Sequence, residues 1–394
     1  MGHGPVYFCF ANPAGFSGQK AATELVIKGL TRRKWTCRRL AQPVLERGEG
    51  VLNALPRYLV ALLVAWIRAL FHLMTKGFIC VELGQTRASF VRDSVPLLLG
   101  WARLGRKRVV VSLHGSLFMN WAERSFDVRA FRFLLNRAGT ITVLGERQRA
   151  RLIDLGLPDH RVVIVVNSCE VEPATAEEVA AKHQLERVPG QTVRLLHLGS
   201  LIDTKGFPEY LEALLRISRL DGPNIDAVLC GPLAASQFSS RFSSLLSAEA
   251  WIDQQIAAIN SSPRVHSRWI KGAVGVEKTS LFREADIFVL PTRYPVEAQP
   301  LVLLEAMASG CAIITTRIGE IPTILDDQSA VFIAEPVNNA LAPVLQVLIG
   351  NAQARSRLAA AAHSRFVAQY GIERHIDQWE MLLEASESET RGAA

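Results

Sequence analysis

The stretch that decides the fold is DIFVLPTRYPVEAQPLVLLEAMASGCAIITT, residues 286–316. Its first apolar run, ending in Pro291, is typical of a buried strand, and the apolar segment after the polar loop predicts a helix that opens near Pro300. Proline suits the first helical turn because its missing N–H would be unpaired there, and Gly310 suits the helix end. The order strand, loop, helix, strand predicts a βα unit of a parallel sheet.

Similar apolar runs recur along the whole chain and form two series. Strands of the first series are expected at 5–11, 78–83, 108–114, 140–145 and 161–167. Strands of the second are expected at 193–200, 226–231, 264–272, 286–291 and 311–316. Continuous apolar strands separated by helices indicate parallel sheets buried on both faces. We therefore expect an α/β protein of two Rossmann-like, doubly wound domains facing each other across a cleft.

Composition and length define the expected domain boundaries. A chain of 394 residues exceeds what one hydrophobic core usually organises. Residues 169–192 are polar and acidic, with two prolines, and are predicted to be a linker with a short helix. The linker would separate an N-terminal domain (1–168) from a C-terminal domain (193–370), and a final helix and tail (371–394) would pack back on the first domain.

The cysteines and the start of the chain indicate a cytoplasmic protein. The six cysteines form no CxxC pair, and Cys9, Cys80 and Cys230 lie within apolar runs. The first residues, MGHGPVYFCFANP, lack the basic region and long apolar stretch of a secretory signal. Ordinary proportions of hydrophobic (49%) and charged (21%) residues exclude a disordered chain.

Charge is distributed unevenly between the two halves. Residues 1–168 hold 25 Lys and Arg against 10 Asp and Glu, whereas the remainder holds 19 against 27. A basic half attracts nucleic acid, an anionic bilayer surface or a phosphate-bearing acceptor. Nucleic acid is disfavoured because no zinc spacing, RNP-like aromatic motif or glycine-rich RNA loop is present.

The segment 57–76, RYLVALLVAWIRALFHLMTK, is the most apolar in the chain. Its longest uncharged run, 58–67, is ten residues, and a bilayer span needs about 20, so it is not expected to cross a membrane. On a helix, Arg68, His72 and Lys76 would share one face. Both an interfacial helix and an ordinary packing helix fit this pattern.

Two carboxylates belong to the deciding stretch, Glu297 in its loop and Glu305 one turn into its helix. The unpaired N–H groups of Leu301 and Val302 and the positive end of the helix dipole predict a diphosphate site. Glu305 would then accept hydrogen bonds from a ribose, and Glu297 would reach a hydroxyl of the transferred sugar. Two glutamates eight positions apart are usually surface charge, but the agreeing strand, proline, helix and glycine favour a site.

Together these features resemble the family 4 glycosyltransferases, retaining GT-B enzymes with an E-x7-E motif in the same strand, loop and helix setting. The resemblance extends through HLGSLIDTKGFPEYLEAL (197–214), VLCGP (228–232) and IGEIPTIL (318–325). In the first domain it includes SLHGS (112–116) and RVVIVVNSCEV (161–171).

The resemblance implies a role for individual residues. Lys205 would be the cation on the donor diphosphate, and His114 would touch the donor sugar or the acceptor near the reacting carbon. Lys205 also reads as a surface lysine at a helix entry, and His114 as a structural histidine at a strand end. Gly15 would let the backbone approach the phosphates, and Lys271 and Gly272 would border the nucleobase.

The main departure from the family pattern is Ser200, which stands where the family has a phosphate-binding arginine. A charge-assisted contact is lost there, so Arg293 or Lys20 must compensate or turnover must be slow. Pro300, Ser168 and Glu170 are further departures, which we regard as tolerable.

No D-x-D triplet occurs in the sequence, so neither a metal nor another cofactor is expected, and Lys205 and helix dipoles would neutralise the leaving diphosphate. The predicted activity is transfer of a hexosyl or deoxyhexosyl group from a UDP-, GDP-, ADP- or dTDP-sugar to a glycan or lipid-linked acceptor in cell-envelope or exopolysaccharide biosynthesis. The enzyme would be cytoplasmic or peripheral on the inner face of an anionic membrane.

Two other classes of protein were weighed. A catalytically weak GT-B protein that serves as a partner or scaffold of another transferase is the alternative, and Ser200 favours it. An NAD(P) oxidoreductase is disfavoured because the first turn, AGFSGQKA, does not give G-x-G-x-x-G.

Overall fold

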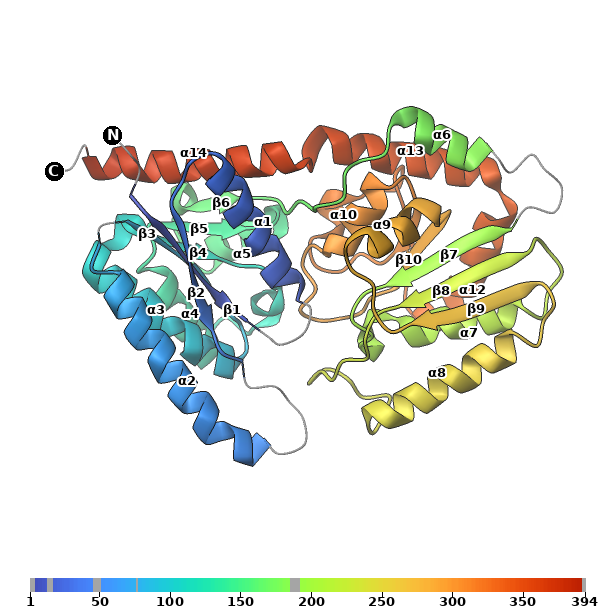
Figure 1. Cartoon of the computed structure of the whole chain (residues 1–394), viewed down its shortest axis with the longest axis horizontal. Coiled ribbons are helices and arrows are strands. Elements are labelled where there is room, and N and C mark those ends of the chain that lie inside the picture. The colour runs from blue at the N-terminus through green and yellow to red at the C-terminus, as the bar shows by residue number, and fades with distance from the viewer. Residues whose placement is uncertain (1–3, 13–16, 45–50, 76, 185–191, 392–394) are drawn as a thin grey trace. The chain divides into compact units, whose positions relative to one another are not determined.

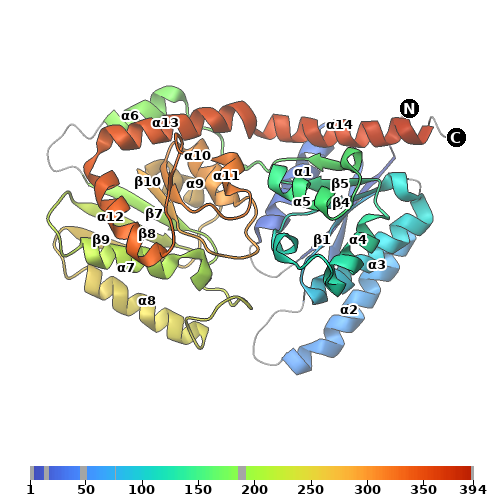
Figure 2. The same cartoon turned by 180° about the vertical axis from the view of Figure 1, so that it is seen from behind.

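The computed structural model describes residues 4–12, 17–44, 51–75, 77–184 and 192–391. The chain divides into two compact units: unit 1 is Met1–Ser168 with Ile372–Ala394, and unit 2 is Cys169–Gly371. Figure 1 shows the labelled elements of each unit, and Figure 2 shows them from behind. The C-terminal helix therefore belongs with the N-terminal strands.

Unit 1 is built on a six-stranded parallel sheet of order β2-β1-β3-β4-β5-β6. Its strands are β1 (Val6–Ala11), β2 (Cys37–Gln42), β3 (Phe78–Glu82), β4 (Val109–Ser112), β5 (Thr140–Val143) and β6 (Val162–Ile164). Its helices are α1 (Gly18–Arg32), α2 (Val51–His72), α3 (Arg87–Leu104), α4 (Phe126–Leu135), α5 (Glu146–Asp154) and α14 (Ile372–Arg391).

Helices cover both faces of this sheet because successive strand residues point to opposite sides. Phe8 and Phe10 of β1 pack with α1 and with Trp379 of α14. Tyr7 and Cys9 of the same strand join the core of the other face, which includes residues of α3, α4 and α5. In Figure 1 α1 and α14 accordingly lie on one side of β1 and α3 and α4 on the other. Unit 1 is thus a doubly wound α/β domain.

Unit 2 has a second six-stranded parallel sheet, of order β12-β11-β10-β7-β8-β9. Its strands are β7 (Val193–Leu198), β8 (Ile225–Cys230), β9 (Val265–Ile270), β10 (Ile287–Leu290), β11 (Ala312–Thr315) and β12 (Val331–Phe332). Its helices are α6 (Ala176–Gln184), α7 (Phe207–Ile217), α8 (Leu245–Ile259), α9 (Gly275–Glu284), α10 (Leu301–Ala308), α11 (Ile321–Ile324), α12 (Val337–Gly350) and α13 (Ala352–Gln369).

One face of this sheet is covered by α7, α8 and α12, which share a core with the strands. On the other face α10 packs against α13, and α13 packs against α6 and β11. Met307 of α10 is fully buried there. The prediction of two doubly wound parallel sheets is confirmed.

Each sheet contains one strand that the sequence pattern did not predict, β2 and β12. Both lie at the edge of their sheet. An edge strand keeps one side in solvent, so it needs no continuous apolar run: β2 reads CRRLAQ, with its two arginines exposed, and β12 has two residues.

The predicted linker, 169–192, packs within unit 2 as far as it is described. The N–H of Ala174 donates to the Ala308 carbonyl at 2.8 Å. The Lys182 ammonium donates to the carbonyls of Phe282 and Ser309, at 3.2 and 3.1 Å. These bonds join residues 174–182 to α9 and to the C-terminal end of α10. Residues 185–191 lie outside the described residues.

Helix α2 begins earlier in the chain than the expected apolar segment, 57–76. It begins at Val51, and its part Ala54–His72 has a mean hydropathy of 1.6 with 11% of it buried. Its length and composition alone are those of a membrane-spanning helix, although its longest uncharged run is only ten residues. Lys76 lies outside the described residues.

Candidate functional site

The sheet of unit 2 has a topological switch point between β7 and β10. From β7 the chain winds outward through β8 and β9, and from β10 it winds outward in the other direction through β11 and β12. The loops that leave β7 and β10 therefore separate to opposite faces, and ligands of open α/β sheets bind in the crevice that this creates at the carboxyl ends of the strands. Residues 199–206 and 291–300 form these two loops.

Lys205 and Glu297, one from each loop, form an ion pair at this point. The Lys205 Nζ lies 3.1 Å from the Glu297 Oε2, with the side chains 21% and 10% exposed. The same ammonium lies 5.3 Å from the ring centroid of Tyr294, within reach of a cation–π interaction. The structure thus brings together two residues that are 92 positions apart in the sequence.

Backbone geometry holds the two loops in close contact. Gly206 has φ 92°, and a Cβ there would lie 2.5 Å from the Pro291 carbonyl oxygen, so only glycine fits. The N–H of Arg293 donates to the Thr204 carbonyl at 2.7 Å. The Asp203 carboxylate accepts the N–H groups of Ser240 and Arg241 at 2.9 and 2.8 Å. The Lys205 side chain therefore projects from a turn whose backbone is held in place.

The IGEIP segment holds the loop of Glu297 from the other side. Gly319 has φ 55°, and a Cβ there would lie 2.2 Å from the Glu297 carbonyl oxygen. The N–H of Glu320 donates to the Ala298 carbonyl at 2.9 Å. This motif was predicted from resemblance alone, and its physical role is to press against the backbone that carries Glu297.

Helix α10 begins at Leu301, so Pro300 occupies the N-cap position and not the first helical turn that the sequence suggested. The cap has no side-chain hydrogen bond, and the N–H groups of Leu301 and Val302 donate to no acceptor within the described residues. Both residues are partly exposed. A helix N-terminus in this state suits an anion. Gly310 has φ 64° just beyond the last turn, as predicted for the helix end.

Glu305 is paired with a lysine that sequence reasoning missed. The Lys278 Nζ of α9 donates to the Glu305 Oε1 at 2.6 Å, with the side chains 13% and 9% exposed. Burial raises the pKa of the Glu305 carboxyl, and Lys278 acts against this rise. Lys278 lies in the polar sequence VEKTS, which gives no motif signal, so only the packing of α9 reveals it.

The remaining predicted donor residues divide into two groups. Arg293 lies in the β10 loop and forms an ion pair with the buried carboxylate of Glu209, while Ser200 lies half-exposed in the β7 loop. Lys271 instead points to solvent, 70% exposed, and bonds Glu249 at 2.5 Å. Beside it, a Cβ on Gly272 would meet no atom within 4 Å, so that position is open.

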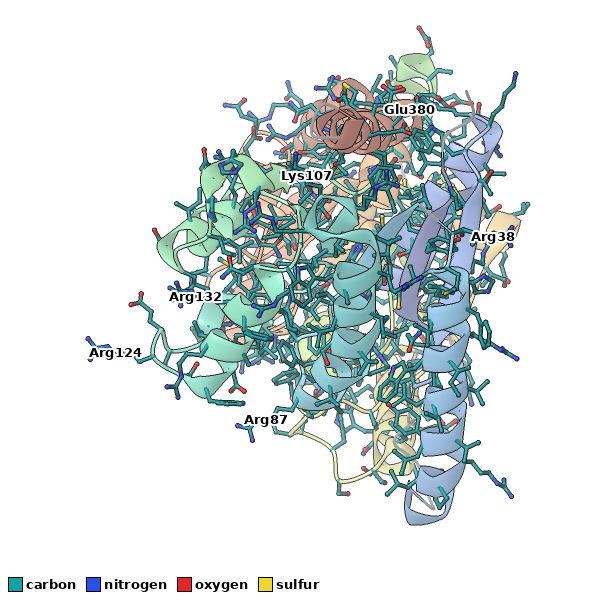
Figure 3. The ribbon with its side chains drawn as sticks, turned by 90° about the vertical axis from the view of Figure 1, so that its left-hand side faces the viewer. Arg38, Arg87, Lys107, Arg124, Arg132 and Glu380 are labelled. Atoms are coloured by element: carbon teal, nitrogen blue, oxygen red, sulfur yellow. The ribbon has the colours of Figure 1, made fainter. Side chains whose placement is uncertain are left out.

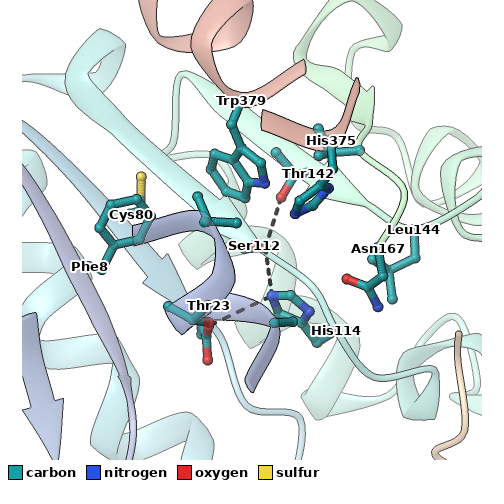
Figure 4. A pocket seen from close by; sticks show the side chains of 14 residues that line it. Phe8, Thr23, Cys80, Ser112, His114, Thr142, Leu144, Asn167, His375 and Trp379 are labelled. Atoms are coloured by element: carbon teal, nitrogen blue, oxygen red, sulfur yellow. Dashed lines mark hydrogen bonds and ion pairs between the residues drawn. The ribbon is translucent and has the colours of Figure 1, made fainter. Parts of the chain in front are cut away.

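In unit 1 His114 lies two residues beyond β4, at the carboxyl edge of the sheet (Figure 4). Its Nε2 is 3.1 Å from the Ser112 Oγ and 3.7 Å from the Glu82 Oε1. These residues line a cavity of about 20 Å³ together with Thr142 and His375. That volume holds about one water and no sugar, so this cavity is not by itself a substrate pocket.

Burial shifts the titratable groups of this cavity toward their neutral forms. Burial, with a smaller contribution from His375, lowers the pKa of His114 to about 4. Burial and the nearby Asp93 raise the pKa of Glu82 well above its usual range. Sequence reasoning missed Glu82, which ends an apolar strand and carries no motif. Neutral His114 donates a hydrogen bond from one ring nitrogen and accepts one at the other.

Two further predictions concern residues or groups that the structure does not place. Gly15 lies outside the described residues. In the part of the chain that is described, no group of three or more His, Cys, Asp or Glu side chains is arranged to hold a metal ion.

Comparison with known proteins finds a family model that matches part of the chain. Residues 179–365 match the family model described as "Glycosyl transferases group 1". No curated protein matches the chain. Unit 2, which contains the Lys205 and Glu297 pair, encloses the matched segment.

Solved structures match over nearly the whole chain. Anabaena Alr3699/HepE in complex with UDP and glucose is 15% identical, with a TM-score of 0.67 over 97% of this chain and 100% of that one. Sucrose-phosphate synthase from Thermosynechococcus elongatus is 16% identical, with a TM-score of 0.68 over 99% and 100%. Identities this low show the fold alone, which is GT-B. Residues 179–365 are therefore similar to a glycosyltransferase group 1 domain, and the chain has the GT-B fold.

Proposed function

We propose that the chain is a retaining glycosyltransferase that moves a hexosyl or deoxyhexosyl group from a nucleotide diphosphate to a glycan or lipid-linked acceptor. The observation that carries the proposal is the Lys205 and Glu297 ion pair at the switch point of the unit 2 sheet, beside the uncapped N-terminus of α10. The cation and the free N–H groups suit a diphosphate, and the two carboxylates suit hydroxyls of the donor sugar and of the ribose.

In this proposal donor binding rearranges the ion pairs of unit 2. The Lys205 ammonium leaves Glu297 and pairs with a phosphate oxygen. Glu297 is then able to accept a hydrogen bond from a hydroxyl of the donor sugar. Arg293 pairs with Glu209 in this structure. On donor binding it supplies the second cation, because position 200 holds serine where the family has an arginine. Glu305 accepts a hydrogen bond from a ribose hydroxyl, while the Lys278 ammonium balances the charge of the Glu305 carboxylate.

Charge on the leaving diphosphate is then neutralised by these cations and the α10 dipole, without a metal or other cofactor. The leaving phosphate oxygen takes the proton of the acceptor on the same face, so we assign no side chain as general base. His114, held neutral, would orient a hydroxyl near the reacting carbon. The enzyme would work in the cytoplasm, on the inner face of an anionic membrane, in cell-envelope or exopolysaccharide biosynthesis.

A mass-spectrometric donor screen tests this function. UDP-, GDP-, ADP- and dTDP-sugars would be incubated with the chain, with Glu297→Ala and with Arg283→Ala, whose exposed ion pair with Glu178 serves as the control. UDP-sugars come first because a fold neighbour, Anabaena Alr3699/HepE, crystallised in complex with UDP and with UDP-glucose. The proposal requires consumption of one donor by the wild type and the control, with little change on addition of EDTA. Full inactivation by EDTA would contradict the metal-free scheme.

The second candidate is a catalytically weak GT-B protein that acts as a partner or scaffold of another transferase. Ser200 favours it because a bidentate contact to the diphosphate is missing, and the Arg293 guanidinium is already engaged by Glu209. A scaffold need not bind nucleotides, whereas an enzyme must. Calorimetric titration with UDP, GDP and ADP therefore separates the two.

A further inference from the structure

Helix α2 presents its apolar side to solvent, the reverse of an ordinary surface helix. Its outward side chains Leu59, Val60, Leu63, Val64, Ile67 and Phe71 are between 41% and 72% exposed. Its inward side chains Leu62 and Ala69, and Leu73 just beyond its end, are at most 5% exposed. Single exposed apolar residues are common on proteins, but a continuous row on one helix marks an interaction surface.

The outward residues form one continuous sector. At about 100° per residue they span an arc of about 140° around the helix axis, with no charged residue inside it. Arg57 and Arg68 lie within about 40° of the Val64 edge of this arc, and both are exposed. On α3, the Arg103 guanidinium lies 3.3 Å from the sulfur of Met74, just beyond the helix end. Basic side chains therefore border the apolar sector.

The inward side fixes α2 to unit 1 and excludes a span of the bilayer. The Trp66 Nε1 donates to the Arg92 carbonyl at 3.2 Å, and Leu73 belongs to the core of that face of the sheet. The strands before and after the helix, β2 and β3, both pair with β1. Since both ends of α2 are tied to neighbours in one sheet, the helix cannot place them on opposite sides of a membrane. Its length and composition then fit a helix that lies in the interface.

The basic residues around the apolar sector favour an anionic membrane over a second copy of the helix as its partner. No acidic residue occurs in 51–75, and unit 1 holds 27 Lys and Arg against 16 Asp and Glu. A second copy of the same helix would bring arginines against arginines. Lipid phosphates would meet the arginines while acyl chains meet the apolar sector. In Figure 3, where this side of unit 1 faces the viewer, side chains of α2 project outward along the helix.

From these observations we propose that the outward sector of α2 inserts into the interfacial layer of an anionic membrane, with Arg57 and Arg68 on lipid phosphates. The inference rests on the peripheral location proposed above and names the surface that produces it. It is independent of catalysis, because vesicle binding can fail while UDP binding persists, and the reverse.

Cosedimentation of the whole chain with vesicles tests the proposal. The vesicles are phosphatidylcholine alone, or phosphatidylcholine mixed with phosphatidylglycerol. The double variant Leu63→Asp with Phe71→Asp should lower partitioning to the anionic vesicles by about tenfold or more. The variants Arg57→Gln and Arg68→Gln should each lower it by about fivefold. The matched control is Leu246→Asp, at a residue 77% exposed on α8, which should bind as the wild type does.

Circular dichroism melts verify that each variant is folded, and the milder Val60→Ser replaces the double variant if the latter unfolds. Sedimentation of the double variant equal to that of the wild type would overturn the proposal, as would equal binding to neutral and anionic vesicles. A wild-type dimer on gel filtration that Leu63→Asp with Phe71→Asp dissociates would assign the sector to a second copy and also overturn it.

Discussion

The ionisable side chains at the carboxyl edges of the two sheets differ in their surroundings. In unit 2, Glu297 and Glu305 each lie beside a lysine ammonium, at 3.1 and 2.6 Å. In unit 1, Glu82 and His114 lie 3.7 Å apart, and burial shifts the pKa of both toward the neutral forms. We infer that the edge of unit 2 is arranged to exchange one charged partner for another, as a diphosphate requires, whereas that of unit 1 suits an uncharged hydroxyl.

The largest expected effect concerns the buried pair of unit 2. Lys278→Ala leaves the Glu305 carboxylate buried without its cation, so the free energy of unfolding should fall by about 3 kcal/mol. Adding Glu305→Gln should recover most of the loss, because the unpaired charge is removed. Denaturant unfolding measures both values. A loss in Lys278→Ala that the second substitution does not relieve would show that the pair is not what α9 contributes.

The second effect concerns catalysis at the Lys205 and Glu297 pair. Glu297→Ala or Lys205→Ala should each lower transfer by about a hundredfold with the fold intact, because each removes a group that contacts the donor. The double variant should be little worse than either single variant, since the two side chains act together. Wild-type rates in both single variants would refute the site. Arg283→Ala again provides the control.

A smaller effect should come from restoring the missing arginine. Ser200→Arg places a guanidinium in the β7 loop, where a charge-assisted contact to a phosphate should tighten donor binding by about tenfold. Titration calorimetry of wild type and variant with the active nucleotide measures this. Unchanged affinity would indicate that Arg293 already supplies the contact, and would remove Ser200 as an argument for a scaffold.

The smallest effect per residue is the dependence of stability on pH. Burial lowers the pKa of His114, His183, His197 and His375 to about 4. The unfolded chain binds these protons near the ordinary pKa of about 6.5, so the stability they contribute is complete above that pH and is lost as pH falls toward 4. Each should cost about 1 kcal/mol at pH 5.5.

Glu82 has the opposite sign, because its pKa is raised in the folded chain. Its contribution is complete below the unfolded pKa and is lost as pH rises through the folded pKa. Glu82→Gln should therefore increase stability at pH 8 relative to the wild type and change little at pH 4. Denaturant midpoints across this range test the comparison of the two units. A wild-type midpoint that does not fall between pH 7 and 5 would contradict the neutral state of the histidines.

The sequence predicted those parts of the molecule that depend on local pattern. Continuous apolar runs located the buried strands, and the loop and helix of 286–316 placed Glu297 and the start of α10 within one residue. Edge strands escaped because one side of each is in solvent. Lys278 and Glu82 escaped because neither lies in a motif, and only the packing of distant segments brings them to Glu305 and His114.

Resemblance alone does not give the direction of the Lys271 side chain. The resemblance implies that the strand end around Lys271 borders the nucleobase, which stays a prediction, and the Lys271 ammonium pairs with Glu249 on α8 and is 70% exposed. The direction of a long side chain at a strand end depends on which acid a neighbouring helix offers, and no local pattern contains that information. Similarly, the outward apolar face of α2 became visible only when its inward residues were fixed by packing.

Calorimetric titration of UDP into the wild type and into Lys205→Ala tests the central claim most directly, namely that a diphosphate binds at the crossing of the β7 and β10 loops. GDP and ADP would be titrated in parallel to identify the base. We predict that one of these nucleotides binds the wild type and that Lys205→Ala weakens its binding by about tenfold or more. Equal binding by both proteins, or no binding of any nucleotide to the wild type, would contradict the account.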